Sequence, residues 1–109
     1  MQCIFCRIVS KEIPALFIAE NENVIVIKDV VPKAPIHFLI IPKIHTDSIN
    51  QFSNDDVQIA DKMLLMARDV AKQNGIESFR LIANTGKQSG QSVFHTHMHF
   101  LSGKQMTDF

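Results

Sequence analysis

The sequence predicts an α+β fold, in which a five-stranded antiparallel sheet carries one long helix on a face and a short helix at the N-terminus. Three observations support it. Short segments rich in aliphatic and β-branched residues recur, one long stretch has helical spacing, and the order of elements is hairpin, strand, helix, hairpin. The 109 residues are expected to form a single domain, 1–109, because a chain of this length has room for one core.

The first third of the chain predicts the short helix and the first hairpin. Residues 7–13 have helical character and stop at Pro14, which cannot continue a helix. Residues 16–19 and 24–28 are rich in strand formers, and Glu-Asn-Glu-Asn between them is typical of a turn. After a connection stiffened by two prolines, residues 37–41 predict a strand that is apolar on both faces and therefore central.

The rest of the chain predicts the long helix and a second hairpin. Ser53 is a candidate N-cap and Gly75 a candidate residue just past the C-cap. Residues 79–84 and 91–101 are the fourth and fifth strands, joined by a loop expected to be flexible. The buried stripe of the helix is predicted to contain Val57, Ala60, Leu64, Ala67, Val70 and Ala71, with Met63 and Met66 as core filler.

Three histidines alternate with other residues in the predicted fifth strand. Side chains on a strand point alternately to its two faces, so His95, His97 and His99 are expected to share one surface. Two chemistries fit such a row: a zinc hydrolase with an activated water, or attack by one neutral imidazole on phosphorus. The glycine-rich loop 86–90, followed by Gln91 and Ser92, favours the second, because backbone amides of such a loop can bind a phosphate.

Charge and composition exclude several classes of partner. Eleven basic side chains balance eleven acidic ones without a run of either sign, so neither nucleic acid nor a membrane surface is expected as a partner. The start, Met-Gln-Cys-Ile-Phe-Cys, lacks the basic and apolar regions of a secretion signal, which predicts a cytoplasmic protein.

Cys3 and Cys6 have Cys-x-x-Cys spacing, which has three interpretations. Thioredoxin-like redox chemistry is disfavoured because no βαβ unit surrounds the pair. Two buried thiols without a function and half of a zinc site both stay open, and zinc would need two further ligands.

The segment His-Thr-His-Met-His-Phe-Leu resembles the signature of the histidine triad family, in which three histidines alternate with apolar residues. The likeness to the Hint branch of purine nucleoside phosphoramidases extends over nearly the whole chain. It is carried by residues 5–15, 29–45, Asn84, 90–92 and 103–106.

This resemblance implies a homodimer that hydrolyses purine nucleoside 5′-phosphoramidates through a covalent nucleotidyl-histidine. It implies His97 as the nucleophile, His99 as a phosphate contact, His95 as an orienting residue and Ser92 as a group that helps the amine leave. Asp29 would bind the ribose hydroxyls. The other nucleotide contacts implied are Val30, Asn84, Gly90, Gln91 and Val93, with apolar base contacts expected from Ile4, Phe5, Ile8 and Ile27.

The resemblance also supplies the two missing metal ligands. Zinc-containing members of the superfamily pair Cys-x-x-Cys with two histidines, which correspond here to His45 and His95. Such a zinc would be structural and unnecessary for the chemistry itself. Two other functions stay open: a dinucleoside polyphosphate hydrolase of the sister Fhit branch, and a nucleotide-binding scaffold dimer without turnover.

Overall fold

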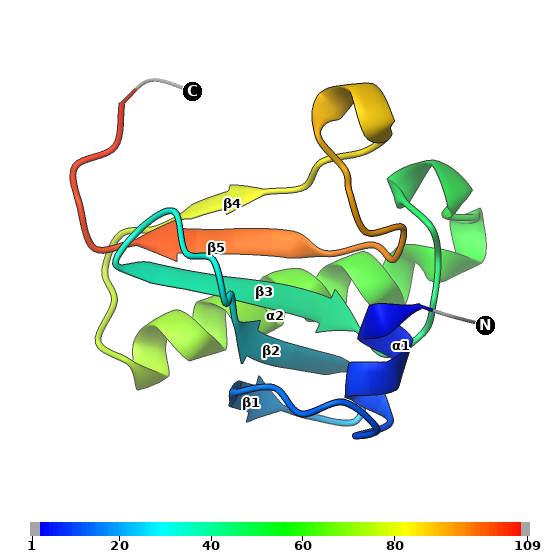
Figure 1. Cartoon of the computed structure of the whole chain (residues 1–109), viewed down its shortest axis with the longest axis horizontal. Coiled ribbons are helices and arrows are strands. Elements are labelled where there is room, and N and C mark those ends of the chain that lie inside the picture. Colours follow the sequence, from blue (N-terminus) through cyan, green and yellow to red (C-terminus); the bar gives the residue numbers. More distant parts are fainter. Residues whose placement is uncertain (1–2, 108–109) are drawn as a thin grey trace.

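Five antiparallel strands form one sheet in the order β1-β2-β3-β5-β4, with a helix on each face (Figure 1). The structure is a computed structural model that describes residues 3–107. This architecture confirms the predicted α+β class, with one long and one short N-terminal helix. The elements are α1 (Ile4–Val9), β1 (Phe17–Glu20), β2 (Val24–Lys28), β3 (Ile36–Pro42), α2 (Val57–Gln73), β4 (Arg80–Ile82) and β5 (Met98–Ser102).

The long helix α2 covers one face of the sheet and forms the larger part of the core. Met63 and Met66 pack there with Ala67, Val70 and Ala71, as predicted for the apolar stripe and its filler. The sheet contributes Val24, Val26, Ile40 and Phe100. The prediction is wrong for Leu64, which is 53% exposed, because the buried stripe follows the spacing 63, 66, 67, 70, 71 and leaves position 64 beside it. The side chain of Val57 lies outside what the structure describes.

The short helix α1 covers the opposite face, where Phe5 and Ile8 pack on a second apolar cluster that includes Ile27. It begins and ends earlier than the predicted 7–13. The Cys3 sulfur accepts the backbone N–H of Cys6 at 3.3 Å and so caps the helix N-terminus before residue 7.

The ends of α2 show one difference from prediction and one agreement. The N-cap is Asp56 rather than Ser53. Ser53 instead precedes a 3₁₀ turn (Asn54–Asp56) that lies ahead of the helix. The Ser53 backbone N–H donates to the Asp56 carboxylate at 2.7 Å. Gly75 does follow the C-cap, with a φ of 66°, and Ile76 N–H donates back to Ala71 O at 2.8 Å.

Strand β5 is shorter than predicted, so of the three alternating histidines only His99 lies on it. The cause is at the end of β3. Extending the β3–β5 register by two residue pairs would place Pro42 opposite Thr96, but proline has no N–H to donate. Thr96 N–H instead donates to Thr46 O at 2.8 Å, which leads the chain away from the ladder.

Between β4 and β5, the loop predicted as flexible contains a 3₁₀ turn over Lys87–Ser89, flanked by Gly86 and Gly90 with positive φ. β4 covers only three residues of the longer strand predicted. No helix within residues 3–107 is long and apolar enough to cross a membrane.

Candidate active site

His97 is held by one hydrogen bond that fixes which of its nitrogens carries a proton. Its Nδ1 lies 2.7 Å from the backbone oxygen of His95, and a carbonyl can only accept, so Nδ1 bears the hydrogen. The lone pair of the neutral ring is therefore on Nε2. Burial lowers the pKa of His97, although the charge of Asp29 acts in the opposite direction. Because the pKa is lowered, the ring is neutral and nucleophilic near pH 7.

His99 belongs to a pair with His37, and a backbone amide sets the protons of both. Lys33 N–H donates to His37 Nδ1 at 3.0 Å, so the hydrogen of His37 is on Nε2. That Nε2 lies 2.9 Å from His99 Nδ1, which must then accept, leaving Nε2–H of His99 available as a donor. Burial, with the neighbouring histidines, lowers the pKa of His99 to about 4.

Asp29 stands beside this pair. One of its carboxylate oxygens lies 3.3 Å from His37 Nε2, and the other accepts Val31 N–H at 2.8 Å. Its charge also acts on His97 and His99, opposing the lowering of their pKa values by burial. The structure therefore brings Asp29 to the histidines, whereas the side chain of Val30 is 92% exposed.

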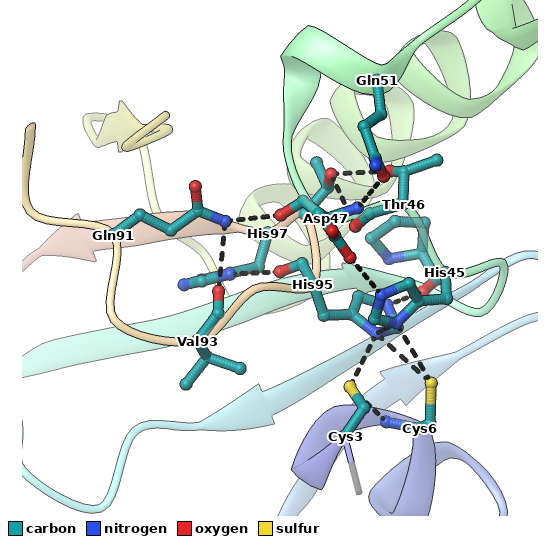
Figure 2. A network of polar contacts seen from close by, with 12 residues as sticks. Cys3, Cys6, His45, Thr46, Asp47, Gln51, Gln91, Val93, His95 and His97 are labelled. Atoms are coloured by element: carbon teal, nitrogen blue, oxygen red, sulfur yellow. Dashed lines mark hydrogen bonds and ion pairs between the residues drawn. The ribbon is translucent and has the colours of Figure 1, made fainter. Parts of the chain in front are cut away.

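The four predicted metal ligands also converge. Their ligand atoms all lie within 4.8 Å of one another (Figure 2). His45 Nδ1 and His95 Nδ1 are 3.1 Å apart, Cys3 Sγ is 3.3 Å from His95 Nδ1, and Cys6 Sγ is 3.4 and 3.6 Å from the two rings. In a tetrahedral zinc site the corresponding edges are about 3.3 Å between nitrogens and about 3.6 Å between nitrogen and sulfur.

The contacts of Nε2 in His45 and His95 show that the two Nδ1 atoms face each other with their lone pairs. His95 Nε2 lies 2.8 Å from the carbonyl of Pro42, and His45 Nε2 lies 2.8 Å from the carboxylate of Asp47. Both partners are acceptors, so in the neutral rings both Nε2 atoms carry hydrogen. Two lone pairs 3.1 Å apart repel unless a cation lies between them, so the donor set fits a zinc ion.

A second cluster with metal-ligating groups, Asp29, His37 and His99, does not fit a metal as well. Because Lys33 N–H already uses the Nδ1 lone pair of His37, a metal on Nε2 would require that ring to lose both protons. This cluster is a chain of hydrogen bonds.

The loop ahead of β5 is held by Gln91, which is buried. Its Nε2 donates to Asp47 O at 2.6 Å and to Val93 O at 3.1 Å, and its Oε1 accepts Gly86 N–H at 2.9 Å. Gly90 packs beside Asn84, whose amide lies 3.7 Å from the position that a Cβ would occupy. Ser92 is exposed and lines a cavity of about 450 Å³ together with Cys3, Ile4, His45, Asp47, Val93 and Phe94.

The predicted base contacts are divided between surface and core. Ile4 is 46% exposed, whereas Phe5, Ile8 and Ile27 are buried in the cluster under α1. Phe5 stands edge-on to the rings of His95 and His97, with centroids 5.8 and 5.0 Å away. The apolar cluster therefore meets the triad through Phe5.

Sequence reasoning missed two residues of the site, His37 and Asp47. His37 begins the segment 37–41, which predicts a strand apolar on both faces, although strand alternation places it in one row with Leu39 and Ile41, on the face of the α1 cluster. That alternation was a usable signal. The position of Asp47 had none, because it depends on a turn after β3.

Comparisons with known proteins show the family of this chain. The sequence profile of a family described as "Scavenger mRNA decapping enzyme C-term binding" matches residues 2–109. The chain is 42% identical to "Protein HitA" of Neisseria gonorrhoeae, over 91% of this chain and 94% of that protein. It is 40% identical to "Adenylylsulfatase HINT1" of Arabidopsis thaliana, over 94% of this chain and 72% of that protein.

The chain belongs to the histidine triad family, and it is of the Hint type. Among solved structures, a "HIT family hydrolase from Legionella pneumophila Philadelphia 1" superposes with a TM-score of 0.94 at 40% identity, over 97% of this chain and 96% of that one. A histidine triad protein from Clostridium difficile gives 0.97 at 36% identity, over 100% and 96%. These likenesses make the chain a hydrolase of the histidine triad family.

Two further relatives concern zinc. A "14 kDa zinc-binding protein" of Brassica juncea is 40% identical over 94% of each chain. A "ZN-bound histidine triad family protein" from Mycobacterium smegmatis has a TM-score of 0.83 at 31% identity, over 95% of this chain and 76% of that one.

Proposed function

We propose that this histidine triad protein hydrolyses the P–N bond of purine nucleoside 5′-phosphoramidates through a covalent intermediate on His97. One observation carries the proposal: the His95 carbonyl holds the proton of His97 on Nδ1, at 2.7 Å. The Nε2 lone pair is then available for attack, and burial keeps the ring neutral by lowering its pKa.

The proposed reaction has two steps. His97 Nε2 attacks phosphorus as the P–N bond breaks, and the amine leaves with a proton delivered by Ser92. Water then attacks phosphorus and the P–Nε2 bond breaks. One proton of that water restores Ser92, the other passes to solvent, and the products are the nucleoside monophosphate and the amine.

The neighbouring groups have roles that follow from their protons. His99 Nε2–H can donate to a phosphate oxygen, since its Nδ1 already accepts from His37 at 2.9 Å. Asp29, a half-buried carboxylate beside the histidines, would accept the ribose hydroxyls. The remaining nucleotide contacts proposed are Val30, Asn84, Gly90, Gln91 and Val93, with the purine against Ile4, Phe5, Ile8 and Ile27.

A second substrate is suggested by the Arabidopsis relative, which is named as an adenylylsulfatase. Adenosine 5′-phosphosulfate also joins a nucleoside 5′-phosphate to a leaving group, so the same attack by His97 would release sulfate. We propose it as an alternative substrate of the same site.

The test is a comparison of purified wild type with His97→Ala on three substrates: an adenosine phosphoramidate, adenosine 5′-phosphosulfate and a diadenosine polyphosphate. We expect wild type to release amine, and we expect the variant to lose at least about 10³-fold in kcat because the nucleophile is gone. Equal rates for the two proteins would contradict the proposal and favour a nucleotide-binding scaffold. Fastest cleavage of the diadenosine compound would favour the Fhit-like alternative.

We further propose that Cys3, Cys6, His45 and His95 hold a structural zinc. When bound, the ion would tie α1 to the segment before β5 and fix the ring of His95. Four protein ligands leave no position for a substrate or an activated water, as is usual for structural sites. Support comes from the ligand spacing in this chain and from the zinc-binding relatives.

A homodimer is the proposed assembly. β4 is an edge strand, so its outer side is available for pairing. Phe79, next to β4 in the chain, is 38% exposed, and Leu64 and Leu65 on α2 are 53% and 47% exposed. A second copy would cover such apolar side chains. Light scattering on wild type and Leu64→Glu should give a dimer and a weakened dimer, and a monomeric wild type would exclude the assembly.

A further inference from the structure

The ring of His45 is held from behind by a carboxylate. Its Nε2 lies 2.8 Å from Asp47 Oδ1, while its Nδ1 points to the sulfur of Cys6 at 3.4 Å. In neutral imidazole a hydrogen on one nitrogen means a lone pair on the other, so the bond to Asp47 presents the lone pair of Nδ1 to the metal site.

The backbone of Asp47 is anchored on both sides, which fixes the point from which its side chain reaches His45 before any metal binds (Figure 2). Its N–H donates to Gln51 Oε1 at 2.6 Å, and its carbonyl accepts from the amide of Gln91 at 2.6 Å. Little ordering is then left for the carboxylate at the moment when zinc binds.

We propose that Asp47 is a positioning residue that sets the zinc affinity of the Cys3, Cys6, His45 and His95 site by orienting His45. The inference rests on the proposed structural zinc. A carboxylate behind a metal-bound histidine fixes its tautomer and raises the basicity of the ring, and removing such a partner usually weakens metal binding about 10- to 100-fold.

The two histidine ligands differ in how they are oriented. Pro42 orients His95 through a backbone carbonyl, at 2.8 Å, which no substitution of a side chain removes. His45 depends on the side chain of Asp47, which is 52% exposed. Substitution at position 47 therefore changes one ligand and leaves the other unchanged.

The test measures zinc affinity by competition with a colorimetric chelator, for full-length wild type, Asp47→Ala and Asp47→Asn. We expect Asp47→Ala to bind zinc about 10- to 100-fold more weakly. Asp47→Asn keeps an acceptor oxygen without the charge, so it should recover part of that loss. Asp61→Asn, which removes an exposed carboxylate on α2, is the matched control and should bind like wild type.

The variants also separate orientation from a purely structural role, because both keep the backbone N–H and carbonyl of residue 47. A role through the backbone alone predicts unchanged zinc affinity, and that result would overturn the inference. The absorption of bound Co²⁺ gives a readout independent of activity, and we expect a tetrahedral thiolate spectrum in wild type that is weaker at equal metal in Asp47→Ala. If wild type binds neither Zn²⁺ nor Co²⁺, the proposed zinc site fails together with this inference.

Discussion

The structure contains two pairs of histidines in which the rings are in contact, and the two pairs differ in the orientation of those rings. His45 and His95 approach Nδ1 to Nδ1 at 3.1 Å, whereas His37 and His99 approach Nε2 to Nδ1 at 2.9 Å. The first arrangement puts two lone pairs together and fits the proposed zinc ion. The second puts a proton between two nitrogens and is a hydrogen bond. Two contacts of nearly equal length therefore serve different chemistry.

The groups behind the rings decide between these arrangements. His45 and His95 each face an acceptor with Nε2, so both Nδ1 atoms are left as lone pairs. His37 faces a donor, the backbone N–H of Lys33, and its own proton is thereby directed to His99. A metal site is distinguished from a hydrogen-bond relay by these outer contacts rather than by the presence of histidines.

Removal of one zinc ligand should give the largest effect and should break only the first pair. Cys6→Ser is expected to weaken zinc binding by more than about 100-fold, because loss of a ligand costs more than loss of the group behind it. Metal analysis after dialysis against a chelator measures this. His37→Asn is the matched control and should keep its zinc, and loss of zinc from both variants would contradict the separation of the two pairs.

Removal of His37 should break the second pair with a smaller effect. His37→Phe takes away the donor to His99 Nδ1, so the proton of His99 is no longer held on Nε2 and its contact to the phosphate weakens. We expect kcat on an adenosine phosphoramidate to fall about 10- to 100-fold, less than for direct loss of an acid or base, because His37 acts through His99. Zinc content should stay that of wild type. His37→Asn, which can still donate through its amide, should recover part of the rate.

The acid dependence of stability should sharpen the comparison. The pKa of His99 is lowered from 6.5 to about 4, so below pH 6.5 the unfolded chain binds a proton that the folded chain does not. Stability from this group is complete above about pH 6.5 and is lost as the pH falls toward about 4. Denaturation of metal-free wild type and His99→Asn across this window should show the flatter profile in the variant. Parallel profiles would contradict the prediction.

The last prediction concerns proton positions and involves no loss of function. Nitrogen-15 spectra of the side chains should show the Nε2–H form for His37, His45, His95 and His99, and the Nδ1–H form for His97, because only His97 donates from Nδ1 to a carbonyl. A spectrum with His97 in the Nε2–H form would contradict its proposed role as nucleophile.

Much of this fold could be predicted from the sequence because its periodicities are clear. The strand 24–28 and the glycine that follows α2 occur where β-rich composition and cap chemistry place them. The extent of β5 could not be predicted, since it depends on Pro42 lying opposite Thr96 in a register that no local pattern reveals. Family resemblance, rather than spacing, predicts that Cys3, Cys6, His45 and His95 come together, and the structure places them side by side.

The relay of His37 and the support from Asp47 depend on contacts that local sequence does not specify. His37 is set by the amide of Lys33, four residues away through a proline-rich turn, and Asp47 by Gln91 across the fold. Backbone donors and acceptors have no signature in the sequence, so proton positions in a site follow only from coordinates.

Pro42 has a consequence for how this protein can diverge. Its missing N–H ends the pairing of β3 with β5, and its carbonyl orients the buried imidazole of His95, so the backbone of one residue both ends a strand pairing and orients a proposed zinc ligand. Such a contact is inherited with the path of the chain and survives most point mutations. The orientation of His45, in contrast, depends on the side chain of Asp47, which a single substitution removes. If the proposed zinc site holds, substitutions at position 47 would change zinc affinity in related sequences while the fold stays constant.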